Sequence, residues 1–171
     1  MQQLKTLVHS GINIDQGTQF TRLTARAIVI KNNKILLMYT NRYEDYSLPG
    51  GGVDEGESIE QGLIRELNEE TGAQKISVVK AFGLYEEYRP WYKDDFDIIH
   101  IKSYCYICNI ADELGKAQLE HYEQQNGMTA KWVNIHDAIA HNERTLANSE
   151  KQGLSILRET YLLKRIADEL I

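Results

Sequence analysis

Three glutamates, Glu66, Glu69 and Glu70, stand at positions i, i+3 and i+4 of a segment with helical periodicity. On a helix of about 3.6 residues per turn they share one face, within roughly 100° of arc. The stretch from 51 to 73 holds seven carboxylates, no lysine and a single arginine, Arg65. Because one guanidinium cannot neutralise this charge, the pattern indicates a divalent cation such as Mg²⁺ or Mn²⁺, which prefers oxygen ligands. The alternative is a solvated acidic face.

The glycine run before this helix favours a metal site over a solvated face. Gly50–Gly52 lack side chains, so their backbone can approach a ligand or offer carbonyl oxygens to a metal. Pro49 biases the preceding residue towards an extended conformation, which predicts a strand and then a loop. Helical spacing follows over residues 57 to 71, and Gly72 stands where a C-cap is expected.

These residues resemble the Nudix box of the MutT-like hydrolases. That pattern is Gly, five residues, Glu, seven residues, then Arg-Glu-aliphatic-any-Glu-Glu-any-Gly-aliphatic. Gly51, Glu57 and the segment from 65 to 73 match eight of its nine defined positions. The exception is Ala73, which is smaller than the usual aliphatic residue and affects packing rather than chemistry. The order of the strands and the C-terminal helix extends the resemblance over residues from about 20 to 170.

The resemblance implies a divalent metal held by the glutamates of the box. By position, Glu66, Glu69 and Glu70 are the expected ligands, and the carbonyl group of Gly50 is a further one. Bound Mg²⁺ or Mn²⁺ neutralises phosphate oxygens and lowers the pKa of a bound water molecule. The expected reaction is hydrolysis of a nucleoside diphosphate linked to another moiety.

The catalytic residues carried over from the family are Glu57, Arg65, Glu66 and Glu69. Glu69 is expected to be a metal ligand or to orient the attacking water. Glu57 and Arg65 are expected to form an ion pair that positions the loop against the helix.

The general base is not fixed by the box. In many family members it is a loop glutamate outside the box, and Glu120 and Glu123 are the candidates here. Plain solvation in a loop is the alternative for each of them.

Substrate contacts are expected from the segment "YEEYRPWYKDDFD", about a dozen residues after the box. Tyr88, Arg89 and Trp91 have the ring faces and the charge to stack on a base and to contact phosphate. Arg26, in the first core strand, is also assigned to the substrate, with a structural salt bridge as the alternative.

The substrate itself is left open by the residues. A short chain with no extra domain favours a nucleoside triphosphate, canonical or oxidised, that yields a monophosphate and pyrophosphate. ADP-ribose and dinucleoside polyphosphates are alternatives, because Pro90 and Tyr88 each fall near a position typical of one of those family branches. A different class is a non-catalytic Nudix module that senses a nucleotide. Such modules usually lack the box glutamates, which are all present here.

The elements that must position these residues can be read from hydrophobic periodicity. Two β-runs flank Asn32–Asn33 and predict a hairpin, and Leu63, Ile64 and Leu67 form the apolar stripe of the acidic helix. Strand-like runs follow at 75–88, 97–110 and 129–135, with a polar loop over about 111–127.

A closing helix is expected at the C-terminal end. Ser149–Gln152 can form its capping box, and Leu154, Leu157, Tyr161, Ile166 and Leu170 follow at roughly helical spacing. Strands, one helix, more strands and a closing helix predict an α/β fold. Together with the resemblance, they predict the Nudix-type α/β/α sandwich around a mixed β-sheet.

Composition sets further limits. A chain of 171 residues with ordinary hydrophobic content predicts a single domain over residues 1–171. The net charge of −6 argues against nucleic acid or an anionic membrane as a partner, but not against a small polyphosphate bound through cations. Cys105 and Cys108 are expected to be reduced, and the N-terminal residues lack a signal peptide's apolar core, so we expect a cytoplasmic protein. The family resemblance adds a homodimer as a possible assembly.

Overall fold

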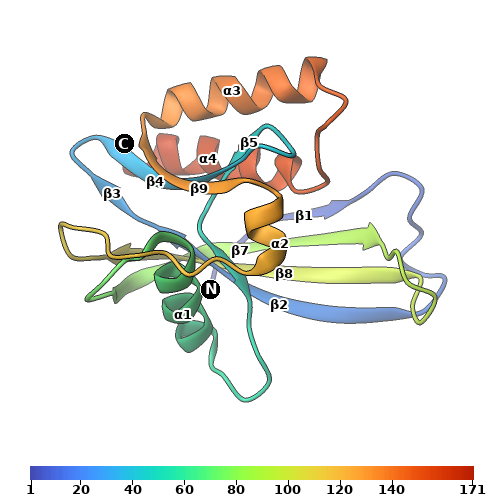
Figure 1. The fold of residues 1–171 in the computed structure, drawn as a ribbon. Helices are drawn as coiled ribbons and strands as arrows, with labels where there is room; N and C mark the ends of the chain where they lie inside the picture. Colours follow the sequence, from blue (N-terminus) through green and yellow to red (C-terminus); the bar gives the residue numbers. More distant parts are fainter.

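The structure, a computed structural model, describes residues 1–171 (Figure 1). Nine strands and four helices follow one another along the chain. They are β1 (Gln3–Val8), β2 (Gln19–Ile28), β3 (Ile30–Lys31), β4 (Lys34–Thr40), β5 (Asp45–Ser47), β6 (Gly50–Gly52), α1 (Ile59–Thr71), β7 (Ser77–Pro90), β8 (Ile98–Asn109), α2 (His121–Gln125), β9 (Met128–Val133), α3 (Ile135–Asn148) and α4 (Ile156–Leu170).

The strands form two sheets rather than one. The larger sheet has the order β1-β7-β8-β2-β6, with β1 parallel to β7, β8 parallel to β2, and the other two pairs antiparallel. In the smaller sheet, β4 pairs with β3, β5 and β9, all antiparallel. The larger sheet is therefore mixed, as the sequence predicted.

Helices cover the sheets from two sides, and each side has its own hydrophobic cluster. Figure 1 shows α1 on one side and the pair α3 and α4 on the other. On the α1 side, Leu63 and Leu67 pack with Ala25 and Ala27 of β2. On the α4 side, the cluster includes Ile28, Tyr85, Leu162, Leu163 and Ile166. This arrangement confirms the predicted α/β/α sandwich.

Local signals behave as the sequence predicts around the β3–β4 hairpin and α1. Asn32 and Asn33 both have positive φ, 48° and 59°, which is the backbone of a tight two-residue hairpin turn. Helix α1 begins after Ser58, which forms a capping box with Gln61, and ends at Gly72, whose φ is 73°.

The apolar stripe of α1 needs one correction. Leu63 and Leu67 are fully buried, whereas Ile64 is 39% exposed. Ile64 lies next to Leu63 in sequence, about 100° further round the helix, and therefore faces away from the sheet.

The C-terminal region differs from the expectation in two ways. Residues 135–148 form α3, which was not predicted, and Ser149 closes that helix instead of opening the next one. Asn134 caps α3, because its side-chain oxygen accepts hydrogen bonds from the backbone N–H groups of His136 and Asp137, and the closing helix α4 begins after Ser155. A short helix, α2, also lies within the predicted loop over 111–127.

The buried face of α4 is shifted from the predicted stripe. Leu154 and Leu157 are 50% and 45% exposed, and the buried apolar residues are Ile156, Leu162, Leu163 and Ile166. The shift brings Arg158 and Glu159, both buried, to the face that meets the sheets.

Cys105 and Cys108 are free and buried, and they belong to the two different hydrophobic clusters. This confirms the prediction that they do not pair. None of the helices is both long and apolar enough to span a membrane.

Candidate active site

Three buried carboxylates converge between α1 and α2. Glu66, Glu70 and Glu123 each place a carboxylate oxygen within 4.8 Å of the others. Glu66 and Glu70 come from successive turns of α1, and Glu123 comes from α2, which lies beside it in Figure 1. Their exposed fractions are only 9%, 5% and 3%.

The electrostatics of this carboxylate cluster fit a divalent cation. Burial raises the pKa of Glu70 to about 8, and it is also the main cause that raises the pKa values of Glu66 and Glu123. Three acids so close together cannot all ionise in a site with little water unless a positive charge joins them. Oxygen ligands of this kind suit Mg²⁺ or Mn²⁺.

Glu69 lies beside the carboxylate cluster rather than in it. Its carboxylate lies 3.4 Å from Nη1 of Arg65, and it lines a polar pocket together with Glu66 and Glu120. Helix geometry explains the difference, because Glu69 points about 100° away from Glu70. Of the four expected metal ligands, the structure places Glu66 and Glu70 in the carboxylate cluster and Glu69 beside it, and Glu123 is the third member of the cluster.

The two candidates for the base take different positions. Glu123 points into the carboxylate cluster, while Glu120 is exposed and lies at the rim of the polar pocket that holds Glu69. The carboxylate of Glu123 also accepts a hydrogen bond of 3.0 Å from the backbone N–H of Glu120. In the sequence, the only signal that this segment reaches the carboxylate cluster is the presence of two glutamates, Glu120 and Glu123, in the predicted loop.

The glycine run is needed because backbone and side chains approach closely there. Gly50 has a φ of 141°, and a Cβ at this position would lie 2.0 Å from the carbonyl oxygen of Ala25. A Cβ at Gly51 would lie 2.6 Å from the carboxyl carbon of Glu66. The N–H of Gly50 donates to Glu70 at 2.7 Å, and its carbonyl group accepts from Nη1 of Arg26 at 2.9 Å.

Arg65 connects the loop before α1 to the helix. It donates to both carboxylate oxygens of Glu57, at 2.9 and 2.8 Å, and to the carbonyl oxygen of Gly52 at 2.9 Å. A further bond of 2.8 Å reaches Glu66. The Arg65 guanidinium lowers the pKa of Glu57 to about 2, so this pair stays charged at neutral pH. The expected ion pair is therefore present.

An arginine-lined cleft of about 560 Å³ lies next to the carboxylate cluster. Arg22, Arg26, Arg89 and Arg158 all line it. Arg89 and Arg158 are paired with Glu87, and Arg158 also binds Glu159. Sequence reasoning did not find Arg158, because the register expected for the last helix gave position 158 no part in the buried face.

Arg22 and Arg26 have no carboxylate partner in the structure. The alternative expected for Arg26, a structural salt bridge, is not observed. Burial lowers the pKa of Arg26, and its Nε atom is buried without a hydrogen-bond acceptor. A buried guanidinium that forms no ion pair with a carboxylate is suited to an anionic ligand.

Two of the expected substrate contacts lie outside the cleft. Tyr88 stacks on His100, with ring centroids 4.2 Å apart, because side chains alternate along β7 and Arg89 takes the cleft side. Trp91 packs edge-on against Phe20 at 4.7 Å. Tyr92, which is 78% exposed, is the aromatic residue of this segment that lines the cleft.

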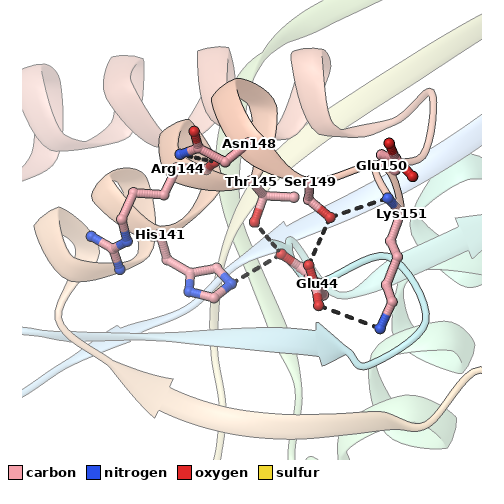
Figure 2. A pocket seen from close by; sticks show the side chains of 8 residues that line it. All are labelled: Glu44, His141, Arg144, Thr145, Asn148, Ser149, Glu150 and Lys151. Atoms are coloured by element: carbon pink, nitrogen blue, oxygen red, sulfur yellow. Dashed lines mark hydrogen bonds and ion pairs between the residues drawn. The ribbon is translucent and has the colours of Figure 1, made fainter.

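The loop between β4 and β5 is held by a latch on α3, which we define as Glu44 with its partners His141, Thr145 and Ser149 (Figure 2). Glu44 has a φ of 54°, which is unfavourable for a residue with a side chain. His141 and Thr145 both bind its carbonyl oxygen, at 2.9 and 2.7 Å, and Ser149 donates to its carboxylate at 2.7 Å. The latch fixes the residues on either side of Glu44, which both line the cleft.

Comparisons with known proteins give a consistent picture. A family model described as NUDIX domain matches residues 21–154. A Caenorhabditis elegans protein provisionally named nudix hydrolase 1 is 29% identical over 123 residues, which cover 68% of this chain and 30% of that protein. An RNA pyrophosphohydrolase of Actinobacillus succinogenes is 41% identical over 66 residues, covering 36% and 34%. The chain thus spans about a third of the length of these curated relatives.

The fold is also found among solved structures. A NUDIX hydrolase from Nitrosomonas europaea superposes with a TM-score of 0.57 over 86% of this chain and 90% of that one, at 18% identity. At this identity the similarity concerns the fold.

Proposed function

Because the chain belongs to the Nudix family, whose domain model matches residues 21–154, we propose that it hydrolyses a phosphoanhydride bond in a nucleoside diphosphate linked to another moiety, using a divalent metal. The observation that carries this proposal is the carboxylate cluster of Glu66, Glu70 and Glu123 beside the arginine-lined cleft. The carboxylate cluster suits a divalent cation, and the arginine-lined cleft suits the anionic phosphates that this cation would activate.

The residues divide the work of such a reaction between them. Glu66, Glu70 and Glu123 would hold Mg²⁺ or Mn²⁺, which when bound supplies charge neutralisation and an acidified water. Arg26, with its unpaired guanidinium, would bind a phosphate oxygen and align the anhydride bond for attack. The exposed carboxylate of Glu120 is placed to accept the proton of water at the rim of the carboxylate cluster.

Residues around this centre would keep it in position. Arg65 fixes the carboxylate of Glu66 and holds the loop through Glu57 and Gly52. Glu69 would orient water at the outer side of the carboxylate cluster, because its carboxylate faces the same polar pocket as Glu120. Residues 1–171 would act together as one domain.

For the substrate we propose a nucleoside triphosphate, canonical or oxidised, which would give a monophosphate and pyrophosphate. The cleft is lined by four arginines, by the glycine run and by tyrosines such as the exposed Tyr92, which suits a polyphosphate joined to a base. ADP-ribose and dinucleoside polyphosphates have the same two parts and are the alternatives.

Product analysis by chromatography tests the proposal. Nucleoside triphosphates, oxidised nucleotides, ADP-ribose, dinucleoside polyphosphates and nucleotide sugars would each be incubated with the protein and Mg²⁺ or Mn²⁺. Glu70→Gln should abolish turnover, and Glu60→Gln, an exposed position on the same helix, should leave it unchanged. Turnover that survives Glu70→Gln would contradict the assigned site. A nucleotide-dependent thermal shift without any turnover would indicate the non-catalytic sensor instead.

A further inference from the structure

Asp45 is a buried acid without a partner at the wall of the cleft. It begins β5, its exposed fraction is 4%, and it lines the cleft together with Ser47 and Thr40. No backbone or side-chain group of the protein donates a hydrogen bond to its carboxylate. Buried acids are usually paired or hydrogen-bonded, so this position requires an explanation.

The nearby cations do not supply the missing partner. Arg158 donates to Glu87 and to Glu159, and Arg89 donates to Glu87 and to Ser155. Burial, with a smaller contribution from Glu159, raises the pKa of Asp45 to about 7. Burial of this carboxyl group therefore destabilises its ionised form, and no hydrogen bond within the protein compensates for that.

Asp45 lines both the arginine-lined cleft and a smaller cavity that adjoins it. The unpaired Arg22 also borders the polar pocket that contains Glu66, which places the anionic part of a ligand beside the carboxylate cluster. Asp45 instead shares a smaller adjoining cavity with Tyr43, Arg89 and Ser155, which does not include the glycine run. An acid beside an aromatic ring is suited to the part of a nucleotide that is planar and uncharged.

The geometry of Asp45 is fixed before a ligand arrives. Its neighbour Glu44 is held by the latch on α3, and residue 45 pairs with Thr40 in the sheet. A preorganised acceptor loses little entropy on binding, so it discriminates between ligands more sharply than a mobile one.

We propose that Asp45 reads the base of the substrate and that this base is guanine. A carboxylate offers two acceptor oxygens side by side, and guanine presents two adjacent donors, N1–H and the N2 amino group, on one edge. Adenine and cytosine present a donor next to an acceptor, and uracil presents one donor between two acceptors, so each would place an acceptor against the carboxylate. The inference rests on the proposed function for the location of the phosphates.

Equilibrium binding of nucleoside monophosphates tests this proposal without turnover, because they contain no anhydride bond. The affinities of GMP, IMP and AMP would be measured by calorimetry with Mg²⁺ for the wild type, Asp45→Asn and Asp168→Asn, an exposed acid on α4. A bidentate contact of this kind is worth roughly 10- to 100-fold in discrimination. The wild type should therefore prefer GMP to AMP by that factor. IMP, which lacks the N2 amino group, should bind about 10-fold more weakly than GMP.

The variants separate base reading from a structural role. Asp45→Asn should weaken GMP binding by roughly 10- to 100-fold and change AMP binding by less than about 3-fold, and Asp168→Asn should change neither. Thermal unfolding would confirm that each variant is folded. An equal loss for all three nucleotides, no preference for GMP in the wild type, or no measurable GMP binding would overturn the inference.

Failure of the inference and failure of the proposed function give different results. If nucleotides are turned over but Asp45→Asn does not change which base is preferred, the inference is overturned and the proposed hydrolase activity stands. Binding of GMP that depends on Asp45, without turnover of any substrate, would support the inference and count against hydrolysis.

Discussion

Replacing Asp45 with asparagine should stabilise the folded protein at neutral and basic pH. The residue is 4% exposed, and burial raises the pKa of its carboxyl group from 3.8 to about 7. Between these values the folded state binds more protons than the unfolded state, so the stability of the wild type falls as pH rises through this window and levels off above it. Asparagine carries no charge and avoids the loss.

The size of the effect follows from the two pKa values. Taking about 1.36 kcal/mol for each tenfold change, the wild type loses about 2 kcal/mol at pH 5 and about 4 kcal/mol at pH 8 relative to a neutral side chain. The advantage of Asp45→Asn should therefore grow by roughly 2 kcal/mol between these pH values.

Urea unfolding at pH 5 and pH 8, followed by circular dichroism, measures this difference, with Asp168→Asn as the exposed control. The midpoint for Asp45→Asn should move further above that of the wild type at pH 8 than at pH 5, with an unchanged slope. A difference that is the same at both pH values, or a wild type that is the more stable protein at pH 8, would refute the reasoning that this acid is buried at a cost.

Three further changes probe the rest of the structure. Arg65→Lys removes the bidentate contact with Glu57 and should lower kcat/KM by roughly 10- to 100-fold at saturating Mg²⁺. If excess Mg²⁺ restores kcat/KM fully, the substitution has changed metal affinity alone. Gly51→Ala places a methyl group against the carboxylate of Glu66 and should reduce kcat/KM at least about 10-fold, and unchanged kinetics would show that the loop can move aside. Glu87, whose pKa is lowered to about 2 because Arg158 and Arg89 outweigh its burial, contributes stability above pH 4.5 that is lost as pH falls towards 2. Glu87→Gln should therefore cost about 3 kcal/mol in urea at pH 7 and much less at pH 2.5, and equal costs at both would contradict this assignment.

The sequence predicts best those parts of the site that are close in the chain. Helical spacing predicts that Glu66 and Glu70 share one face, and the steric freedom of glycine predicts that Gly50–Gly52 can approach them closely. The structure shows both features. The ion pair of Glu57 and Arg65 joins residues only eight apart in the sequence, one in the loop before α1 and one in the helix itself.

Contacts between distant segments could not be predicted in the same way. Glu123 reaches the carboxylate cluster from α2, a segment far from α1 in the sequence, and nothing in its local sequence distinguishes it from Glu120. Tyr88 and Arg89 are neighbours in the chain but face opposite sides of a strand whose register was unknown. In the C-terminal region, Ser149 has the sequence of an N-cap, yet α3 continues up to it because Asn134 starts that helix earlier.

The carboxylate cluster also has a consequence for the order of folding. Helix α1 can form locally, but β2 finds its parallel partner β8 at a distance of 79 residues, as in the pair Thr24 and Ser103, and Glu123 lies in a still later segment. Closing such long loops is slow, because chain entropy is lost before the contacts are gained. If the carboxylate cluster holds a metal as proposed, a refolding chain should show helical signal first and bind the metal tightly only when α2 is in place. A metal-sensitive probe should then report a later step of folding than circular dichroism does.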